Sequence, residues 1–512
     1  MADGNFYKKL AEEFSEFLEK PFLTIPYGRT LSYGEIDALA GEMAGALIEK
    51  GLKPGDRLVV QVEKSAENVA LYLAAMRAGL VYVPLNTAYT ADEVEYFLSD
   101  AQPSIFVCDP AKAKDLASVA EKSDVNTVLT LDADGRGSLT DSAKSACPFN
   151  EVQPRHSDDL AVILYTSGTT GRSKGAMLTH ENLSSNAIAL NQLWGFSPDD
   201  VLLHALPIFH IHGLFVALHT AMLSGCEILF LPKFDVAAVR SALPRASVMM
   251  GVPTFYSRLA AEPAFHQKDC AHMRLFISGS APLTEEAFSA FGSRSGHRIL
   301  ERYGMSEAGM IASNLLDGER VPGSVGYALP GVVVRITDEA GADAPIGSPG
   351  GVEVKGPNVF KGYWRNPEKT AEEFTADGFF KTGDIGALGE DGRLTLMGRS
   401  KDLIIAGGYN IYPKEIEQVL DAVEGVAESA VIGVPHPDLG EGVVAVIVAE
   451  KDLPDDTALA EAIETLAKFK QPRKFFRVDE LPRNAMGKVQ KQQLRERFKE
   501  AYSKNSKRFL TF

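Results

Sequence analysis

Short apolar runs alternate with helical patterns along the first three hundred residues of this chain. Runs such as "RLVVQVE", "VYVPLN" and "SIFVCD" are separated by amphipathic stretches such as "TADEVEYFLSDA". Strands that alternate with helices in this way form largely buried sheets that the helices cover. The sequence therefore predicts an α/β fold for the N-terminal part, and a length of 512 residues is enough for two to four folding units.

The pattern changes after about residue 320. The runs "GVVVRI", "GGVEVKG" and "GRLTLMGR", divided by turn residues, predict hairpin-linked strands in a β-barrel-like subdomain. From Lys401 onward, two helical and several strand-like patterns form a segment of about the size of one small α+β domain. We therefore predict an N-terminal domain over 1–398 and a C-terminal domain over 399–512, with the boundary near Arg399 and Lys401.

The charge balance and the cysteines exclude several kinds of partner and site. Lys and Arg number 52 and Asp and Glu number 68, which gives a net charge of −16. Such a surface repels phosphate backbones, so we expect no nucleic-acid partner, and a bound anion needs a local positive site. The 4 cysteines form no CxxC pair, which suits a reducing compartment. Because the sequence shows no signal segment and no long apolar run, we expect a cytoplasmic protein without a membrane partner.

A segment rich in glycine and hydroxyl side chains, "YTSGTTGRSKG" at 165–175, follows the apolar run "LAVIL". Backbone N–H groups and hydroxyls at the end of a strand can bind an anion, and glycine lets the backbone come close to it. The nucleotide-binding P-loop pattern does not match, because Ser173 rather than glycine precedes Lys174. The local residues leave two interpretations open, an anion-binding loop and a plain flexible turn.

Further motifs decide between these interpretations. They follow the first in this order: "LPIFHIHG" (206–213), "SGSAPL" (278–283), "YGMSE" (303–307), "KTGD" (381–384), "GRSKDLIIAGGYNIYPKEIE" (398–417) and "LPRNAMGK" (481–488). Together they resemble the adenylate-forming superfamily of acyl-CoA synthetases, luciferases and peptide-synthetase adenylation domains. The resemblance implies a large N-terminal domain, a mobile C-terminal domain, and a reaction in two halves. A carboxylate attacks the α-phosphate of MgATP to give an acyl-adenylate and pyrophosphate, and a thiol such as that of CoA then displaces AMP.

The resemblance also implies roles for particular residues at the ATP site. The residues implied for the β- and γ-phosphates are Thr166, Ser167, Gly168, Thr169, Thr170, Gly171 and Lys174. Those implied around the base and the α-phosphate are Gly279, Ser280, Ala281, Pro282, Tyr303, Gly304, Met305 and Ser306, where Ser306 stands in place of the family's commoner threonine. Glu307 is implied as the Mg²⁺ ligand, and Asp384 and Arg399 as partners of the ribose hydroxyls.

In the same family a lysine that matches Lys488 reaches across from the small domain to the substrate carboxylate and the α-phosphate. Without the motif, the basic run around it is typical of a solvated surface. Acetylation would remove this charge, so a lysine acetyltransferase is a hypothetical partner. Lys401 lies at the implied hinge, and rotation there would bring Gly407 and Gly408 to line a passage for the thiol arm.

Length and motif variants resemble those of malonyl-CoA and methylmalonyl-CoA synthetases within the superfamily. A dicarboxylic acid needs a cation for its second carboxylate, and Arg258 in "GVPTFYSRL" is a candidate, although the same arginine could lie on a helix surface. His210 is expected to shape the acid pocket, to gate the site or to close over the thioester channel. The alternatives are a fatty or aryl acid, loading of a separate carrier protein, a luciferase-like oxidation, and a non-catalytic acid-binding relative.

Overall fold

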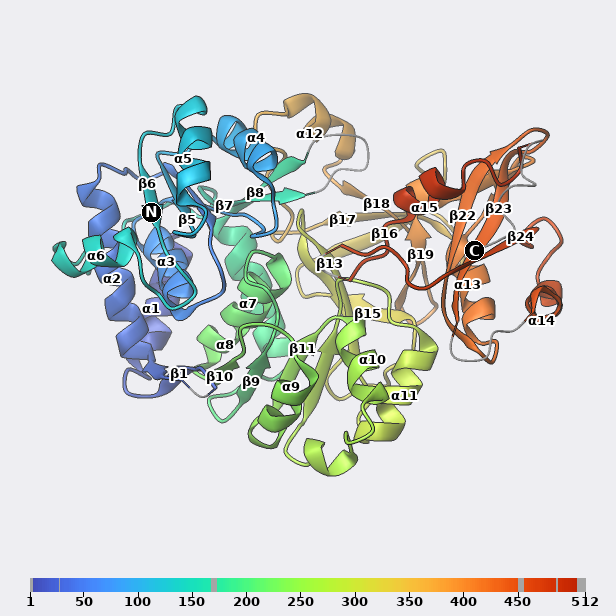
Figure 1. Cartoon of the computed structure of the whole chain (residues 1–512), viewed down its shortest axis with the longest axis horizontal. Helices are drawn as coiled ribbons and strands as arrows, with labels where there is room; N and C mark the ends of the chain where they lie inside the picture. Colours follow the sequence, from blue (N-terminus) through green and yellow to red (C-terminus); the bar gives the residue numbers. More distant parts are fainter. Residues whose placement is uncertain (1–2, 27, 167–172, 450–454, 485–486, 504–512) are drawn as a thin grey trace.

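The computed structural model describes residues 3–26, 28–166, 173–449, 455–484 and 487–503 (Figure 1). Its strands form three sheets, of 6, 13 and 5 strands. Figure 1 shows the smallest sheet at one end of the long axis, and the two larger sheets with their helices make up the rest. Over the described ranges, no helix has the length and apolar character needed to cross a membrane. The predicted α/β class with a smaller C-terminal domain is confirmed.

The described ends of the glycine-rich segment lie on two strands at one edge of the 6-stranded sheet. Its strands follow the order β6 (Val128–Thr130), β5 (Ile105–Cys108), β3 (Arg57–Gln61), β4 (Val81–Pro84), β7 (Leu160–Thr166) and β8 (Lys174–Thr179). Neighbouring strands are parallel except β7 and β8, which pair antiparallel with Thr166 opposite Lys174. The helices of this part of the chain are α1 (Phe6–Ser15), α2 (Tyr33–Glu49), α3 (Ala66–Arg77), α4 (Ala91–Ala101), α5 (Ala113–Lys122), α6 (Ser138–Ser145) and α7 (His180–Leu193).

The helix α3 is the centre of the N-terminal core. All 12 of its residues are buried, including the polar Glu67, Asn68 and Arg77 near its two ends. Its N-cap Ser65 accepts a hydrogen bond from the backbone N–H of Asn68, which satisfies one of the free donors of the first turn. Tyr72 on α3 shares a hydrogen bond of 2.8 Å with His219, so the helix is tied to the segment that packs on the second sheet.

The 13-stranded sheet combines a parallel part with an antiparallel part. Its order is β16 (Val333–Thr337), β17 (Gly350–Lys355), β18 (Phe380–Leu388), β19 (Leu394–Arg399), β15 (Ser324–Ala328), β14 (Gly309–Ser313), β13 (Leu300–Met305), β12 (Leu275–Ser278), β11 (Val248–Gly251), β9 (Val201–His204), β10 (Glu227–Phe230), β1 (Pro21–Thr24) and β2 (Thr30–Ser32). Strands β13, β12, β11, β9, β10 and β1 pair in parallel. The chain leaves β9, β12 and β13 directly into "LPIFHIHG", "SGSAPL" and "YGMSE", so these motifs gather at the carboxyl ends of parallel strands, where open α/β sheets bind ligands.

Shorter helices connect these strands. They are the π-helix η1 (His212–Ala217), α8 (Leu218–Ser224), α9 (Val236–Ala242), η2 (Leu243–Arg245), α10 (Pro253–Ala261), η3 (Gln267–Cys270), α11 (Glu285–Ser295) and α12 (Pro367–Glu373). The hairpin-linked strands predicted after residue 320 continue the same sheet as β15 to β19.

The 5-stranded sheet begins after the short turn η4 (Ser400–Asp402). Its order is β21 (Tyr409–Ile411), β20 (Ile404–Ala406), β23 (Gly440–Ala449) and β22 (Val426–His436), and β24 (Lys474–Val478) pairs with β23. Its helices are α13 (Pro413–Asp421), α14 (Asp456–Ala462), η5 (Ile463–Thr465) and α15 (Lys491–Phe498). The chain thus changes sheet between Arg399 and Ile404. The division into 1–398 and 399–512, with a hinge near Lys401, stays a prediction.

Candidate active site

A cavity of about 1360 Å³ lies between the 13-stranded sheet with its helices and the smaller C-terminal part. Residues from both sides line it, including the segment 278–286, Tyr303 and Asp384 from the large sheet's side and Lys488 from the C-terminal side. The structure therefore brings together motifs that lie more than two hundred residues apart in the sequence.

Asp384 is held at one corner of this cavity by two polar side chains. It stands opposite Arg399 across β18 and β19, and its Oδ1 lies 2.8 Å from Nε of Arg399. The hydroxyl of Tyr303 donates to Oδ2 of Asp384 at 2.5 Å. Burial raises the pKa of Tyr303 well above its usual value, so this hydroxyl stays a donor. The corner presents a fixed, buried carboxylate that can accept hydrogen bonds from a ligand.

Glu307 forms a second polar corner where the chain turns after β13. Its side chain is buried, and Oε1 accepts hydrogen bonds from Thr166 Oγ1 at 3.4 Å and from the Tyr363 hydroxyl at 3.3 Å. Burial raises the pKa of the Glu307 carboxyl, and the charge of Arg399 opposes that rise. The ammonium of Lys174 lies 5.2 Å from the centre of the ring of Tyr363, whose hydroxyl donates to Glu307. A buried carboxylate with neutral partners has oxygen lone pairs available for a hard cation.

The glycine-rich segment is described only at its ends. Thr166 and Lys174 lie beside the Glu307 corner, and the hydroxyl of Thr166 is 3.5 Å from the Lys174 carbonyl. Ser167, Gly168, Thr169, Thr170 and Gly171 lie outside the described residues. Their phosphate-binding role stays a prediction.

Lys488 lines the cavity from the C-terminal side. Its backbone N–H donates to the Asn484 side chain at 2.9 Å, and the preceding Gly487 has a positive φ of 74°. Burial, together with the charge of Arg399, lowers the pKa of Lys488 to about 8, while Asp384 acts in the opposite direction. Lys488 therefore lies in the electrostatic field of the Asp384 corner, and its role at the reacting groups stays a prediction.

A buried arginine that the sequence reasoning missed lies on the other side of Tyr303. Arg302 in β13 is 4% exposed, and its Nε and Nη2 have no hydrogen-bond partner in the described part of the structure. Its guanidinium rests on Gly279, where an added Cβ would lie 2.3 Å from Cζ. The only local signal was a charged residue inside an apolar strand, directly before "YGMSE".

Further unpaired polar groups belong to the same region. The Ser278 hydroxyl and Nε2 of His212 are buried without a partner among the described residues, while Nδ1 of His212 shares a hydrogen bond of 3.2 Å with Ser280 Oγ. Ser280 has a φ of 72°, which is uncommon for a residue other than glycine and typical of functional sites. Buried polar groups without partners cost free energy, so we infer that a polar ligand completes this cluster.

Some predicted residues lie elsewhere. Arg258 is exposed near the end of α10 and is not among the residues that line the cavity. His210 lies in the loop before η1, and burial lowers its pKa to about 4, so it is neutral. Gly407 and Gly408 form the exposed turn between β20 and β21, outside the cavity lining.

Five further residues were predicted to lie around the base and the α-phosphate. Ala281, Pro282 and Gly304 line the cavity, whereas Met305 and Ser306 continue from the end of β13 toward Glu307.

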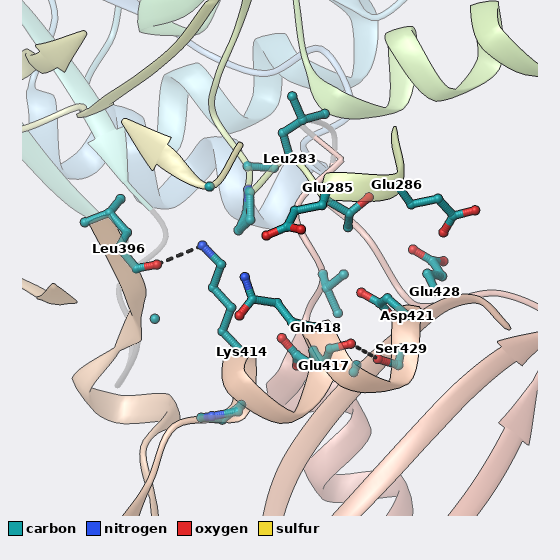
Figure 2. A pocket seen from close by; sticks show the side chains of 18 of the residues that line it. Leu283, Glu285, Glu286, Leu396, Lys414, Glu417, Gln418, Asp421, Glu428 and Ser429 are labelled. Atoms are coloured by element: carbon teal, nitrogen blue, oxygen red, sulfur yellow. Dashed lines mark hydrogen bonds between the residues drawn. The ribbon is translucent and has the colours of Figure 1, made fainter. Parts of the chain in front are cut away.

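Figure 2 shows a part of the cavity that is rich in carboxylates. Glu285 and Glu286 of α11 lie on one side, and Glu417, Asp421 and Glu428 lie on the other. Lys414 extends from α13 and donates to the carbonyl of Leu396 at 2.8 Å, which connects the C-terminal part to β19. An anionic ligand is therefore favoured near Arg302, Arg399 and Lys488 rather than beside these carboxylates.

Comparison with known proteins agrees with this geometry. Residues 10–364 match the family model described as "AMP-binding enzyme", and residues 415–488 match "AMP-binding enzyme C-terminal domain". The malonate–CoA ligase of Arabidopsis thaliana is 34% identical, covering 91% of this chain and 84% of that protein.

Two solved structures extend the comparison. The ATP-bound MatB of Rhodopseudomonas palustris is 53% identical, with a TM-score of 0.95 over 98% of this chain and 100% of that one. The apo form of the same protein, with the same coverage, gives a TM-score of 0.86. The present arrangement thus lies closer to that of the ATP-bound relative.

Proposed function

We propose, for this chain that belongs to the AMP-binding enzyme family, that the acid it activates is malonate. Methylmalonate is an alternative of the same class. The chain is an adenylate-forming acyl-CoA ligase. One carboxylate of malonate would attack the α-phosphorus of ATP to give malonyl-adenylate and pyrophosphate. The thiol of CoA would then attack the acyl carbon and release AMP, which gives malonyl-CoA.

The unpaired guanidinium of Arg302 is the observation that carries the choice of malonate. When one carboxylate of a dicarboxylic acid reacts, the other remains charged and needs a cation with two free donors. Nε and Nη2 of Arg302 are such donors, and an arginine can bind a carboxylate through two parallel hydrogen bonds. A fatty or aryl acid would leave the buried guanidinium unpaired, which costs more than the roughly 1–3 kcal/mol of a neutral group. We therefore assign the second carboxylate to Arg302 rather than to Arg258.

The two polar corners support ATP binding. Asp384 would accept hydrogen bonds from the ribose hydroxyls, and Arg399 keeps its carboxylate oriented. Glu307 would hold a Mg²⁺ ion, because Mg²⁺ in nucleotide sites is held by one or two carboxylates together with substrate oxygens. No group of three or more His, Cys, Asp or Glu side chains within the described residues could hold a metal ion by itself. Bound Mg²⁺ would neutralise part of the phosphate charge.

We further propose that the C-terminal part rotates between the two half-reactions. Lys488 lines the cavity while Gly407 and Gly408 lie exposed outside it. The better superposition on an ATP-bound relative supports the present arrangement as the one that forms the adenylate. Rotation about Lys401 would withdraw Lys488 and bring the glycines inward to line the thiol passage. Acetylation of Lys488 stays a prediction.

A panel of acids tests the proposed substrate. Malonate, methylmalonate, acetate, octanoate and coumarate are supplied with ATP, and thioester formation is measured with CoA and with a holo carrier protein. We expect malonate with CoA to give the highest kcat/KM. Higher activity with octanoate or coumarate would contradict the choice of acid, and a preference for the carrier protein would contradict CoA as the acceptor.

The first half-reaction is expected to lose activity as pH rises through about 8. The ammonium form of Lys488 supplies the charge, and burial lowers the pKa of this group to about 8, so a higher pH removes the charge. The descending limb should appear in kcat/KM for malonate, which reports on the free enzyme. It is measured as pyrophosphate release before CoA is added. Lys488→Arg stays charged at this pH, so its profile should lack the limb even if its rate is lower.

A further inference from the structure

One partly buried lysine outside the sites described above has a hydrogen-bond partner for each of its three donors. Lys64 follows β3, and its Nζ lies 2.8 Å from Nδ1 of His204, 3.0 Å from the His204 carbonyl and 2.6 Å from the Leu231 carbonyl. The ring of Phe230 lies 4.2 Å from the same nitrogen. An ammonium group has three donors and no acceptor, so these three neutral acceptors match it in number.

The hydrogen-bond partners determine which nitrogens of Lys64 and His204 carry hydrogens. Nε2 of His204 lies 2.9 Å from the carbonyl oxygen of Gly213, which can only accept, so Nε2 carries the hydrogen. Burial, together with the charge of Lys64, lowers the pKa of His204 well below its usual value, so the ring is neutral and has one N–H. Nδ1 must then accept, and Lys64 donates three hydrogens. Burial alone lowers the pKa of Lys64, but loss of a proton would leave one buried acceptor unpaired.

Lys64 and His204 hold the loop 205–213 at Gly213, whose carbonyl accepts a hydrogen bond from His204. Gly213 belongs to the π-helix η1, and single π turns are frequent at functional sites. An added Cβ on Gly213 would lie 2.0 Å from the Pro207 carbonyl oxygen, so the loop closes tightly on itself at this residue. The neighbouring His212 is hydrogen-bonded to Ser280 beside Arg302. A connected path therefore runs from Lys64 through His204 and Gly213 to the acid side of the cavity.

We propose that Lys64 and His204 are positioning residues that set the orientation of the loop 205–213 and so the affinity for the acid. The inference deepens the proposed function and rests on it, because it takes the cluster around Ser280 and Arg302 as the acid pocket. A purely structural role, in which Lys64 only ties the ends of β9 and β10 together, predicts a different outcome. Losing that tie would lower the melting temperature and weaken the binding of ATP and acid alike.

Three variants separate these roles. Lys64→Met removes all three donors. His204→Gln places an amide N–H near the position of Nε2, whereas His204→Asn reaches only the position of Nδ1. We expect Lys64→Met and His204→Asn to raise KM for malonate about tenfold. Each change frees Gly213 from the hold of His204, and losing one buried hydrogen bond at the loop costs about that factor. We expect His204→Gln to stay within about twofold of wild type, because it restores the donor to Gly213.

KM for ATP and the melting temperature complete the test, with Lys233→Met as the matched control. Lys233 is exposed and lies two residues beyond Leu231, so its substitution should change none of these values. Equal rises in KM for malonate and ATP, a lowered melting temperature, or equal effects of Asn and Gln at position 204 would overturn the proposal. If wild type does not use malonate, the proposed function fails by itself. KM is then measured for the preferred acid, and the same comparison decides the positioning role.

Discussion

Lys488→Ala is expected to lower the rate of malonyl-adenylate formation by about 10²–10³ while thioester formation from supplied malonyl-adenylate continues. The first half-reaction brings an anionic acid to an anionic phosphate, and a preorganised charge at the reacting oxygens is worth about that factor. Lys488 reaches the cavity from the C-terminal side, and it is the charge we expect to leave when that part rotates. Pyrophosphate release measures the first half, and malonyl-CoA formation from synthetic adenylate measures the second.

A loss in the first half-reaction without a loss in the second would show that Lys488 acts specifically on adenylate formation. Lys499 lies exposed on the C-terminal part, beside Glu496, and Lys499→Ala serves as the control with both rates unchanged. An equal loss in both halves would point to a damaged C-terminal part rather than to a missing charge. Adenylation close to the wild-type rate would show that Lys488 does not act on the reacting groups.

The sequence alone contained much of this site. Asp384 and Arg399 lie 15 positions apart, and only Arg399 belongs to a run that was predicted as a strand, "GRLTLMGR". The structure pairs the two residues across β18 and β19. The alternation of strands and helices predicted a strand directly before the glycine-rich segment, and β7 is that strand. The approach of Lys488 could not be derived in this way, because no local pattern says which face of a small domain meets a large one. It came from the resemblance alone.

The spacing of apolar residues around Arg258 indicates that this arginine lies on the exposed side of its helix. On α10 the buried residues Pro253, Tyr256 and Leu259 recur every three positions, which marks the core-facing side of the helix. Arg258 stands two positions after Tyr256 and therefore points away from that side. Arg302 could not be found so easily. Its strand β13 is buried on both faces over its first four residues, so alternation does not show which residues face a ligand.

Arg302→Met is expected to lower kcat/KM for malonate by about 10²–10³ without loss of stability. Removing one partner of a buried charge pair costs about 3–5 kcal/mol in the bound state. In the free enzyme the guanidinium is buried without a charged partner, and burial lowers its pKa, so an apolar side chain of similar length should leave the melting temperature unchanged or higher. Affinity for ATP, measured without the acid, should stay at the wild-type value.

Two companion variants separate loss of the cation from general damage to the pocket. Gly279→Ala keeps the guanidinium but displaces it, because the new Cβ would lie 2.3 Å from Cζ of Arg302, and we expect a smaller rise in KM for malonate. Arg258→Met removes an exposed arginine from α10 and should leave malonate kinetics unchanged. A monocarboxylic acid such as propionate, which has no second charge to pair, should lose nothing with Arg302→Met and gain relative to malonate.

Comparison of Arg258→Met with Arg302→Met thus shows which arginine binds the second carboxylate of malonate. If Arg258→Met abolishes malonate activity while Arg302→Met preserves it, the exposed arginine must move into the pocket when substrate binds, and the buried guanidinium has another partner. If both variants keep wild-type kinetics with malonate, the preference for a dicarboxylic acid does not depend on either guanidinium. Loss with Arg302→Met for malonate and propionate alike would make Arg302 a structural support of β13 rather than a determinant of specificity.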